Sequence, residues 1–162
     1  MNHLEQLVAE WHEYRGYFVR RNIHVGKRIG GGYECELDVV AFHPGLKHLV
    51  HVEPSMDAHS WQMREQRYVK KFNAGRKFIP MLFDGIDVPI EIDQIALFGI
   101  GSNVNNAQIG GGRVLMMTDF LSEITTDLRS KRIEKQAVSE QYPLLRTIQF
   151  MCQHQKLLSK KS

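Results

Sequence analysis

The segment ECELDVVAFHPGLKHLVHVEPS, residues 34–55, constrains the fold of this chain more than any other stretch. Two apolar runs flank the turn sequence HPGLK, and this pattern predicts a β-hairpin with strands over 33–42 and 47–53. Acidic residues interrupt both runs, with Asp38 in the first strand and Glu53 in the second. Because a carboxylate in an apolar strand needs either solvent or a partner, the hairpin raises the question of what these two residues face.

Alternation along the two strands arranges the acidic residues in rows. Successive side chains point to opposite faces of a strand, so Glu34, Glu36 and Asp38 are expected to share one face, as are His51 and Glu53. If both rows lie on the same side of the sheet, two carboxylates come close together. They then repel each other unless a cation lies between them. Mg²⁺ is the usual cation, because it prefers oxygen ligands. The alternative is a solvent-exposed acidic face of an antiparallel sheet.

Hydrophobic periodicity predicts the remaining elements and an α/β fold. The first two are an amphipathic helix over 3–15 and a strand over 16–25. The others are a helix over 57–74 that Asp57 or Ser60 caps and Gly75 ends, strands over 77–83 and 93–101, a glycine-rich loop over 102–113, and helices from about residue 118, the last over 143–158.

Length and composition favour a single domain over residues 1–162, large enough to bury a core without disulfides. Cys35 and Cys152 lie far apart and are expected to be reduced residues of a cytoplasmic protein. No apolar run approaches the roughly 18 residues of a membrane span, and the first residues do not resemble a signal peptide. The net charge of +3 permits a nucleic-acid partner without requiring one.

The order of the predicted elements resembles that of the PD-(D/E)xK, or restriction-endonuclease-like, nuclease superfamily. The resemblance rests on GYFVRRN at 16–22, ELDVVAF at 36–42, HVEPS at 51–55 and SWQMREQRYVKKF at 60–72, and it covers about residues 3–100. It implies a mixed central sheet flanked by helices. It also implies hydrolysis of DNA phosphodiester bonds with the help of Mg²⁺ or Mn²⁺.

The resemblance assigns roles to individual residues. Asp38 is similar to the metal-binding acid of the family's second strand, and Glu53 to the acid of the (D/E)xK half-motif. Glu10 on the first helix and Glu36 on the acidic strand are further candidate metal ligands. The chain departs from the pattern at Ser55, which stands where the family has its lysine. A serine hydroxyl carries no charge and cannot stabilise a phosphate as that lysine does.

Two cations on the following helix, Arg64 and Lys71, are candidates to replace the missing lysine. If one of them reaches Glu53, the resemblance implies an endonuclease in which Asp38, Glu53 and that cation are catalytic. If neither does, it implies a catalytically inactive nuclease-fold module for nucleic-acid binding or protein interaction. Glu65, near the centre of the apolar stripe of the same helix, also needs a partner inside the protein, either at this site or in a salt bridge to an Arg or Lys.

The C-terminal part, about residues 118–158, is expected to form helices with one strong apolar stripe each. Isolated helices of this length are marginal in water, so the stripes must be buried on the sheet or on a second copy of the chain. Nucleases of the superfamily often dimerise because duplex DNA has two strands, which implies a homodimer with the last helix near its interface. Two alternatives stay open: the helices close the core of one monomer, or they serve another partner.

Overall fold

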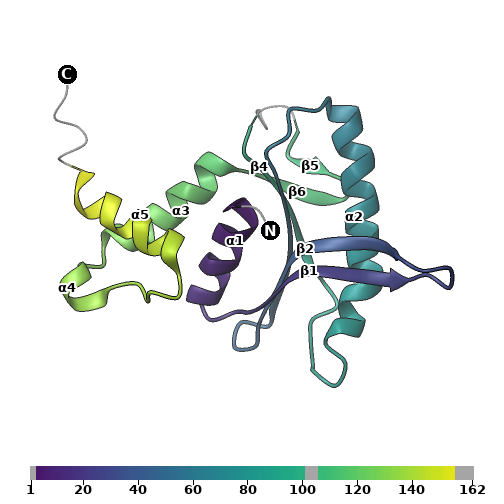
Figure 1. Cartoon of the computed structure of the whole chain (residues 1–162), viewed down its shortest axis with the longest axis horizontal. Helices are drawn as coiled ribbons and strands as arrows, with labels where there is room; N and C mark the ends of the chain where they lie inside the picture. The colour runs from purple at the N-terminus through teal and green to yellow at the C-terminus, as the bar shows by residue number, and fades with distance from the viewer. Residues whose placement is uncertain (1–2, 101–105, 156–162) are drawn as a thin grey trace. The chain divides into compact units, whose positions relative to one another are not determined.

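The computed structural model describes residues 3–100 and 106–155, which form an α/β protein with a mixed sheet (Figure 1). The chain divides into two compact units, Met1–Met117 and Thr118–Ser162. The elements are α1 (His3–Tyr14), β1 (Phe18–Lys27), β2 (Tyr33–His43), β3 (His48–Ser55), α2 (Trp61–Leu82), β4 (Asp93–Phe98), β5 (Gln108–Ile109), β6 (Gly112–Met116), α3 (Met117–Arg129), α4 (Ile133–Gln136) and α5 (Pro143–Gln153).

The sheet has the strand order β1-β2-β3-β4-β6-β5. Its first three strands are antiparallel neighbours, whereas β3, β4 and β6 run parallel to one another. The predicted hairpin between β2 and β3 is confirmed, and its register pairs Val39 with Val52 and Val40 with His51. After β3 the chain returns through α2 to the parallel strand β4. In Figure 1, α1 and α2 lie on opposite sides of the sheet.

Helix α2 is longer than the sequence predicts. Gly75 does not end it, and the strand expected over 77–83 is wrong, because this run is the last part of the helix. Ile79, within that run, is fully buried in the cluster that α2 forms with the first strands of the sheet. The glycine has a packing role instead: a Cβ at this position would lie 2.4 Å from Nδ1 of His51 on β3. Gly75 therefore lets the helix approach the sheet closely.

The predicted loop over 102–113 is also partly wrong, since residues from 108 onward form the edge hairpin β5–β6. Gly110 and Gly111 make its turn with positive φ angles of 58° and 83°. A Cβ on Gly110 would lie 2.5 Å from the backbone carbonyl carbon of Tyr68, so the turn packs directly on α2. Residues 101–105, which belong to the predicted loop and to the end of the predicted strand before it, lie outside the described residues.

The second unit contains the predicted C-terminal helices α3 and α5 with the short α4 between them. Gln149 on α5 is buried and holds the connection: its Oε1 accepts from the backbone N–H of Val138 at 2.9 Å, and its Nε2 donates to the carbonyl oxygen of Gln136 at 2.9 Å. Helix α5 ends at Gln153 with His154 as its C-cap, and residues 156–158 of the predicted helix lie outside the described residues. The buried apolar residues of α3 are Phe120, Ile124 and Leu128.

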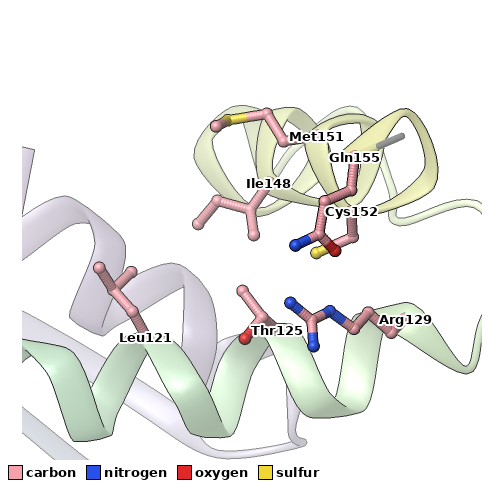
Figure 2. A pocket seen from close by; sticks show the side chains of 7 residues that line it. All are labelled: Leu121, Thr125, Arg129, Ile148, Met151, Cys152 and Gln155. Carbon is pink, nitrogen blue, oxygen red and sulfur yellow. The ribbon is translucent and has the colours of Figure 1, made fainter. Parts of the chain in front are cut away.

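A pocket of about 260 Å³ lies between α3 and α5 within this unit (Figure 2). Leu121 and Thr125 line it from α3, and Ile148 and Cys152 from α5. Both cysteines of the chain are free thiols, and each is half-buried. None of the helices in the described ranges combines the length and the apolar composition that crossing a membrane requires.

Candidate active site

Asp38 and Glu53 lie side by side on the face of the sheet that α2 covers, with Lys71 between them. The backbone N–H of Asp38 donates to Oε1 of Glu53 at 3.1 Å. Nζ of Lys71 lies 2.8 Å from Oδ1 of Asp38 and 2.7 Å from Oε2 of Glu53. The Glu53 side chain is only 1% exposed and that of Lys71 16%. The predicted approach of the two carboxylates is therefore confirmed, and the cation between them is a lysine.

Strand register and helix packing create this arrangement. The register of β2 and β3, continued by one residue beyond Val39 and Val52, places Asp38 directly opposite Glu53. Tyr68, one turn before Lys71 on α2, is fully buried and donates its hydroxyl to the carbonyl oxygen of Glu53 at 3.1 Å. Because residues three apart lie on the same side of a helix, this contact places Lys71 over the carboxylates.

Glu36 does not share the face of Asp38, and that prediction is wrong. Its side chain accepts from Nδ2 of Asn22 at 3.3 Å and lies 3.5 Å from Nε2 of His24, while only its backbone carbonyl accepts from Nζ of Lys71, at 2.6 Å. Leu37 and Asp38 both face α2, so the alternation breaks between them.

The break coincides with a distortion of the neighbouring strand β1. Asn22 lies across from Asp38 in the register of β1 and β2 and has a positive φ of 49°. Arg21 and Asn22 both contact glutamates of α1, at 2.8 Å and 3.2 Å, although they are consecutive in the strand. The sequence of β2 alone contains no signal for this change of face, since its cause involves two strands.

Glu10 is buried on α1 and accepts from Nε2 of Gln6 at 2.9 Å. Helix α1 covers the face of the sheet opposite to α2 (Figure 1). Within the described ranges, no group of three or more His, Cys, Asp or Glu residues is arranged to hold a metal ion. Of the four predicted metal ligands, the structure thus brings two together.

The charges of the three central residues are strongly coupled. Burial and the neighbouring Glu53 raise the pKa of Asp38 from 3.8 to about 7. Burial also opposes ionisation of Glu53, but the hydrogen bond from His51 and the charge of Lys71 outweigh it and lower the pKa of Glu53 from 4.5 to about 2. For Lys71, burial opposes the charged form, yet both carboxylates outweigh it and raise its pKa. At neutral pH, Glu53 and Lys71 are therefore charged, while Asp38 is near its midpoint.

The stability of the metal-free protein is expected to depend on pH through Asp38. The folded protein holds this proton up to about pH 7 and the unfolded chain only up to about pH 4, so the free energy of unfolding should fall as the pH rises through this window. Asp38→Asn cannot titrate there, and the difference between its stability and that of the wild type should grow with pH. Urea unfolding in a chelator, between about pH 4.5 and pH 7.5, measures this difference. A difference that does not change with pH would show that Asp38 titrates normally.

Arg64, the other candidate cation, is engaged elsewhere. Its Nε donates to Oδ1 of Asp57 at 3.1 Å, Nη2 donates to the carbonyl oxygens of Asp57 and Ile100, and its guanidinium lies 4.5 Å from the ring centre of Phe98. Asp57 also accepts from the hydroxyl of Ser55. Arg64 thus ties the connection between β3 and α2 to the end of β4, and the cation that reaches Glu53 is Lys71.

Two other polar residues of α2 have local partners. Ser60 is the N-cap, since its hydroxyl accepts from the backbone N–H of Met63 at 3.4 Å, which decides between the two predicted caps. Glu65 accepts from the backbone N–H of Gly110 at 3.1 Å. The partner of Glu65 is therefore the turn of the edge hairpin. Neither of the two predicted partners, the carboxylate site or an Arg or Lys in a salt bridge, accounts for its position.

His51 and Gln94 are site residues to which the sequence analysis assigned no role, although it placed His51 on the same face as Glu53. His51 is fully buried, and its Nε2 lies 2.8 Å from Oε1 of Glu53. Nε2 of Gln94 on β4 lies 3.2 Å from Nδ1 of the same imidazole. His51 stands two residues before Glu53 and therefore on the same face of β3, which was the available signal. Gln94 lies opposite His51 on the neighbouring strand β4, but it is 43 residues away in the sequence and had no such signal.

In comparisons with known proteins, no family model matches the chain and no curated protein matches it. The geometry defines the class of site: a buried pair of carboxylates from two antiparallel strands, bridged by a lysine from the helix that covers them. This site belongs to an α/β protein whose central sheet is mixed.

Proposed function

We propose that this protein is a metal-dependent nuclease of the PD-(D/E)xK type that hydrolyses DNA phosphodiester bonds, with Lys71 acting in place of the motif lysine. The observation that carries the proposal is the position of Nζ of Lys71, 2.8 Å from Asp38 and 2.7 Å from Glu53. The order α1-β1-β2-β3-α2-β4, with β3 and β4 parallel, supports a restriction-endonuclease-like core.

Asp38 and Glu53 are the residues that would hold Mg²⁺ or Mn²⁺. Mg²⁺ commonly binds through one or two protein carboxylates together with substrate phosphates and water, so a pair suffices. Oε2 of Glu53 supports this reading: it is buried, and its contact with Lys71 is a close ionic one without a hydrogen bond of good geometry. When bound, the metal would polarise a phosphoryl oxygen and activate water.

Lys71 would act as a charged donor and not as a base. The two carboxylates raise its pKa, so the ammonium stays protonated at neutral pH. A fixed ammonium next to the metal ligands stabilises negative charge that develops on a phosphate during hydrolysis. Glu53 remains ionised and contributes an anionic oxygen, while Asp38 must lose its proton before it can serve as a ligand.

A groove of about 380 Å³ beside this site supports a nucleic acid as the substrate. Arg28, Lys70 and Lys77 line it together with Glu34, which lies 3.1 Å from Nζ of Lys77, and Lys70 directly precedes Lys71 in α2. Cys35, at the wall of the groove, precedes the residue whose carbonyl accepts from Lys71. Lysine and arginine side chains that follow a groove bind the phosphate backbone without reading its sequence. The groove therefore suits the strand on either side of the cleaved bond.

Plasmid nicking is the direct test of the proposed activity. The wild-type protein should convert supercoiled DNA to the open-circular form with Mg²⁺ or Mn²⁺ and should be inactive in excess chelator. Asp38→Ala removes one of the two ligands and should lose both nicking and Mn²⁺ binding in calorimetry. Circular dichroism of the variant controls for folding. Nicking that persists in chelator or in the folded Asp38→Ala variant would contradict the proposal.

The second candidate is a catalytically inactive nuclease-fold module that binds nucleic acid or protein. One observation favours it: Lys71 already neutralises the carboxylate pair, so no metal is needed to balance their charge. In that case the wild type binds no Mn²⁺ in calorimetry, and neither Mg²⁺ nor Mn²⁺ supports nicking. The homodimer that the resemblance implies stays a prediction.

A further inference from the structure

A chain of buried polar groups lies behind Glu53 and connects it to the surface of α2. Nη1 of Arg76 donates to Oε1 of Gln94. Nε2 of Gln94 donates to the carbonyl oxygen of Phe72 at 2.9 Å and lies 3.2 Å from Nδ1 of His51. Nε2 of His51 then lies 2.8 Å from Oε1 of Glu53. His51, Glu53 and Gln94 are all buried, so water does not replace these partners.

The two outer partners of Gln94 determine how its amide is oriented. An arginine side chain only donates hydrogen bonds, so Arg76 must face the amide oxygen. A backbone carbonyl only accepts, so the oxygen of Phe72 must face the amide nitrogen. The two requirements are independent and agree. The amide nitrogen of Gln94 therefore carries a second hydrogen that points to Nδ1 of His51.

The orientation of Gln94 in turn determines the tautomer of His51. Nδ1 accepts a hydrogen bond and carries no proton, so the proton of the imidazole is on Nε2 and is donated to Oε1 of Glu53. Oε1 also accepts from the backbone N–H of Asp38 and is thereby fully used. The other oxygen, Oε2, is the one presented to Lys71.

We propose that His51 and Gln94 are positioning residues, which hold Glu53 in one rotamer and present its Oε2 to the metal by keeping the His51 proton on Nε2. Hydrogen-bond partners of metal ligands typically affect metal affinity by about 10-fold to 100-fold when they are removed. The role toward the metal rests on the proposed function, whereas the tautomer and the rotamer do not.

The tautomer is measured directly in the wild-type protein. Long-range proton–nitrogen correlation spectra of ¹⁵N-labelled protein should show His51 with a protonated Nε2 and an unprotonated Nδ1. In Gln94→Glu, the carboxylate still accepts from Arg76 but cannot donate to Nδ1, so this pattern should be lost. A wild-type spectrum with a proton on Nδ1 would overturn the proposal, with or without metal and without any variant.

Variants of His51 test the role toward the metal. His51→Gln retains a donor that reaches Glu53, and its Mn²⁺ affinity should stay within about 10-fold of the wild type. His51→Leu has a similar size without a donor and should bind Mn²⁺ about 10-fold to 100-fold more weakly while remaining folded by circular dichroism. Equal affinities of the two folded variants would overturn the positioning role. A wild type that binds no Mn²⁺ refutes the proposed function and the metal role, and the spectrum still decides the tautomer.

Discussion

Replacing Lys71 with methionine is expected to lower the rate of plasmid nicking by about 10²-fold to 10³-fold, the cost of removing one preorganised donor from an active site. The same change should lower the free energy of unfolding by about 3 kcal/mol, because removing one partner of a buried ion pair leaves the other charge uncompensated. Here Glu53 is almost completely buried and stays ionised, while Asp38 relieves part of the cost by taking up a proton. Urea unfolding and nicking assays at equal protein concentration measure both effects.

Lys47→Met is the matched control for this variant. Lys47 also forms an ion pair, 3.0 Å from Asp87, but its side chain is 71% exposed and that of its partner 88%. Exposed pairs contribute little because solvent screens them. This variant should be indistinguishable from the wild type in nicking and unfolding. If Lys71→Met retains full nicking, Lys71 is not the replacement for the motif lysine.

Gly75→Ala is expected to destabilise the protein by about 2–3 kcal/mol, the cost of overpacking a tightly packed site. The new Cβ would lie 2.4 Å from Nδ1 and 2.7 Å from Cε1 of His51, and 2.9 Å from Nε2 of Gln94. Neither side chain can retreat, since both are held in the hydrogen-bond chain that ends at Glu53. Intrinsic helix propensity predicts the opposite sign, because alanine is favoured over glycine by about 1 kcal/mol inside a helix.

Urea unfolding followed by circular dichroism shows whether Gly75→Ala lowers or raises the free energy of unfolding. Gln66→Ala, an exposed position of the same helix, serves as the control and should change stability by less than about 0.5 kcal/mol. Gly75→Ala should also lose the Nε2-protonated pattern of His51 if any folded protein remains. A variant as stable as the wild type would show that α2 does not depend on this close approach.

The carboxylate pair was largely predictable from sequence, whereas its surroundings were not. Asp38 and Glu53 were expected to approach each other because side chains alternate along the two strands of the hairpin, which arranges the acidic residues in rows that can meet on one side of the sheet. The same reasoning failed two residues away at Glu36, where Asn22 on the neighbouring strand adopts a positive φ and the alternation breaks. Sequence periodicity describes a regular strand and cannot anticipate a distortion that two strands share.

The sequence by itself determined the α/β class, the hairpin and the acidic pair, because turn chemistry and side-chain alternation depend on residues that are neighbours in the chain. Tertiary structure alone decided between Lys71 and Arg64, since both are cations on the same edge of α2 and only packing shows that Arg64 is held by Asp57. It also decided the length of α2. Local propensity predicts that Gly75 ends the helix, but Gly75 lies inside α2 and makes room for His51 on β3. The choice of cation and the length of α2 both depend on contacts between residues that are distant in the chain, and the local sequence pattern does not contain such contacts.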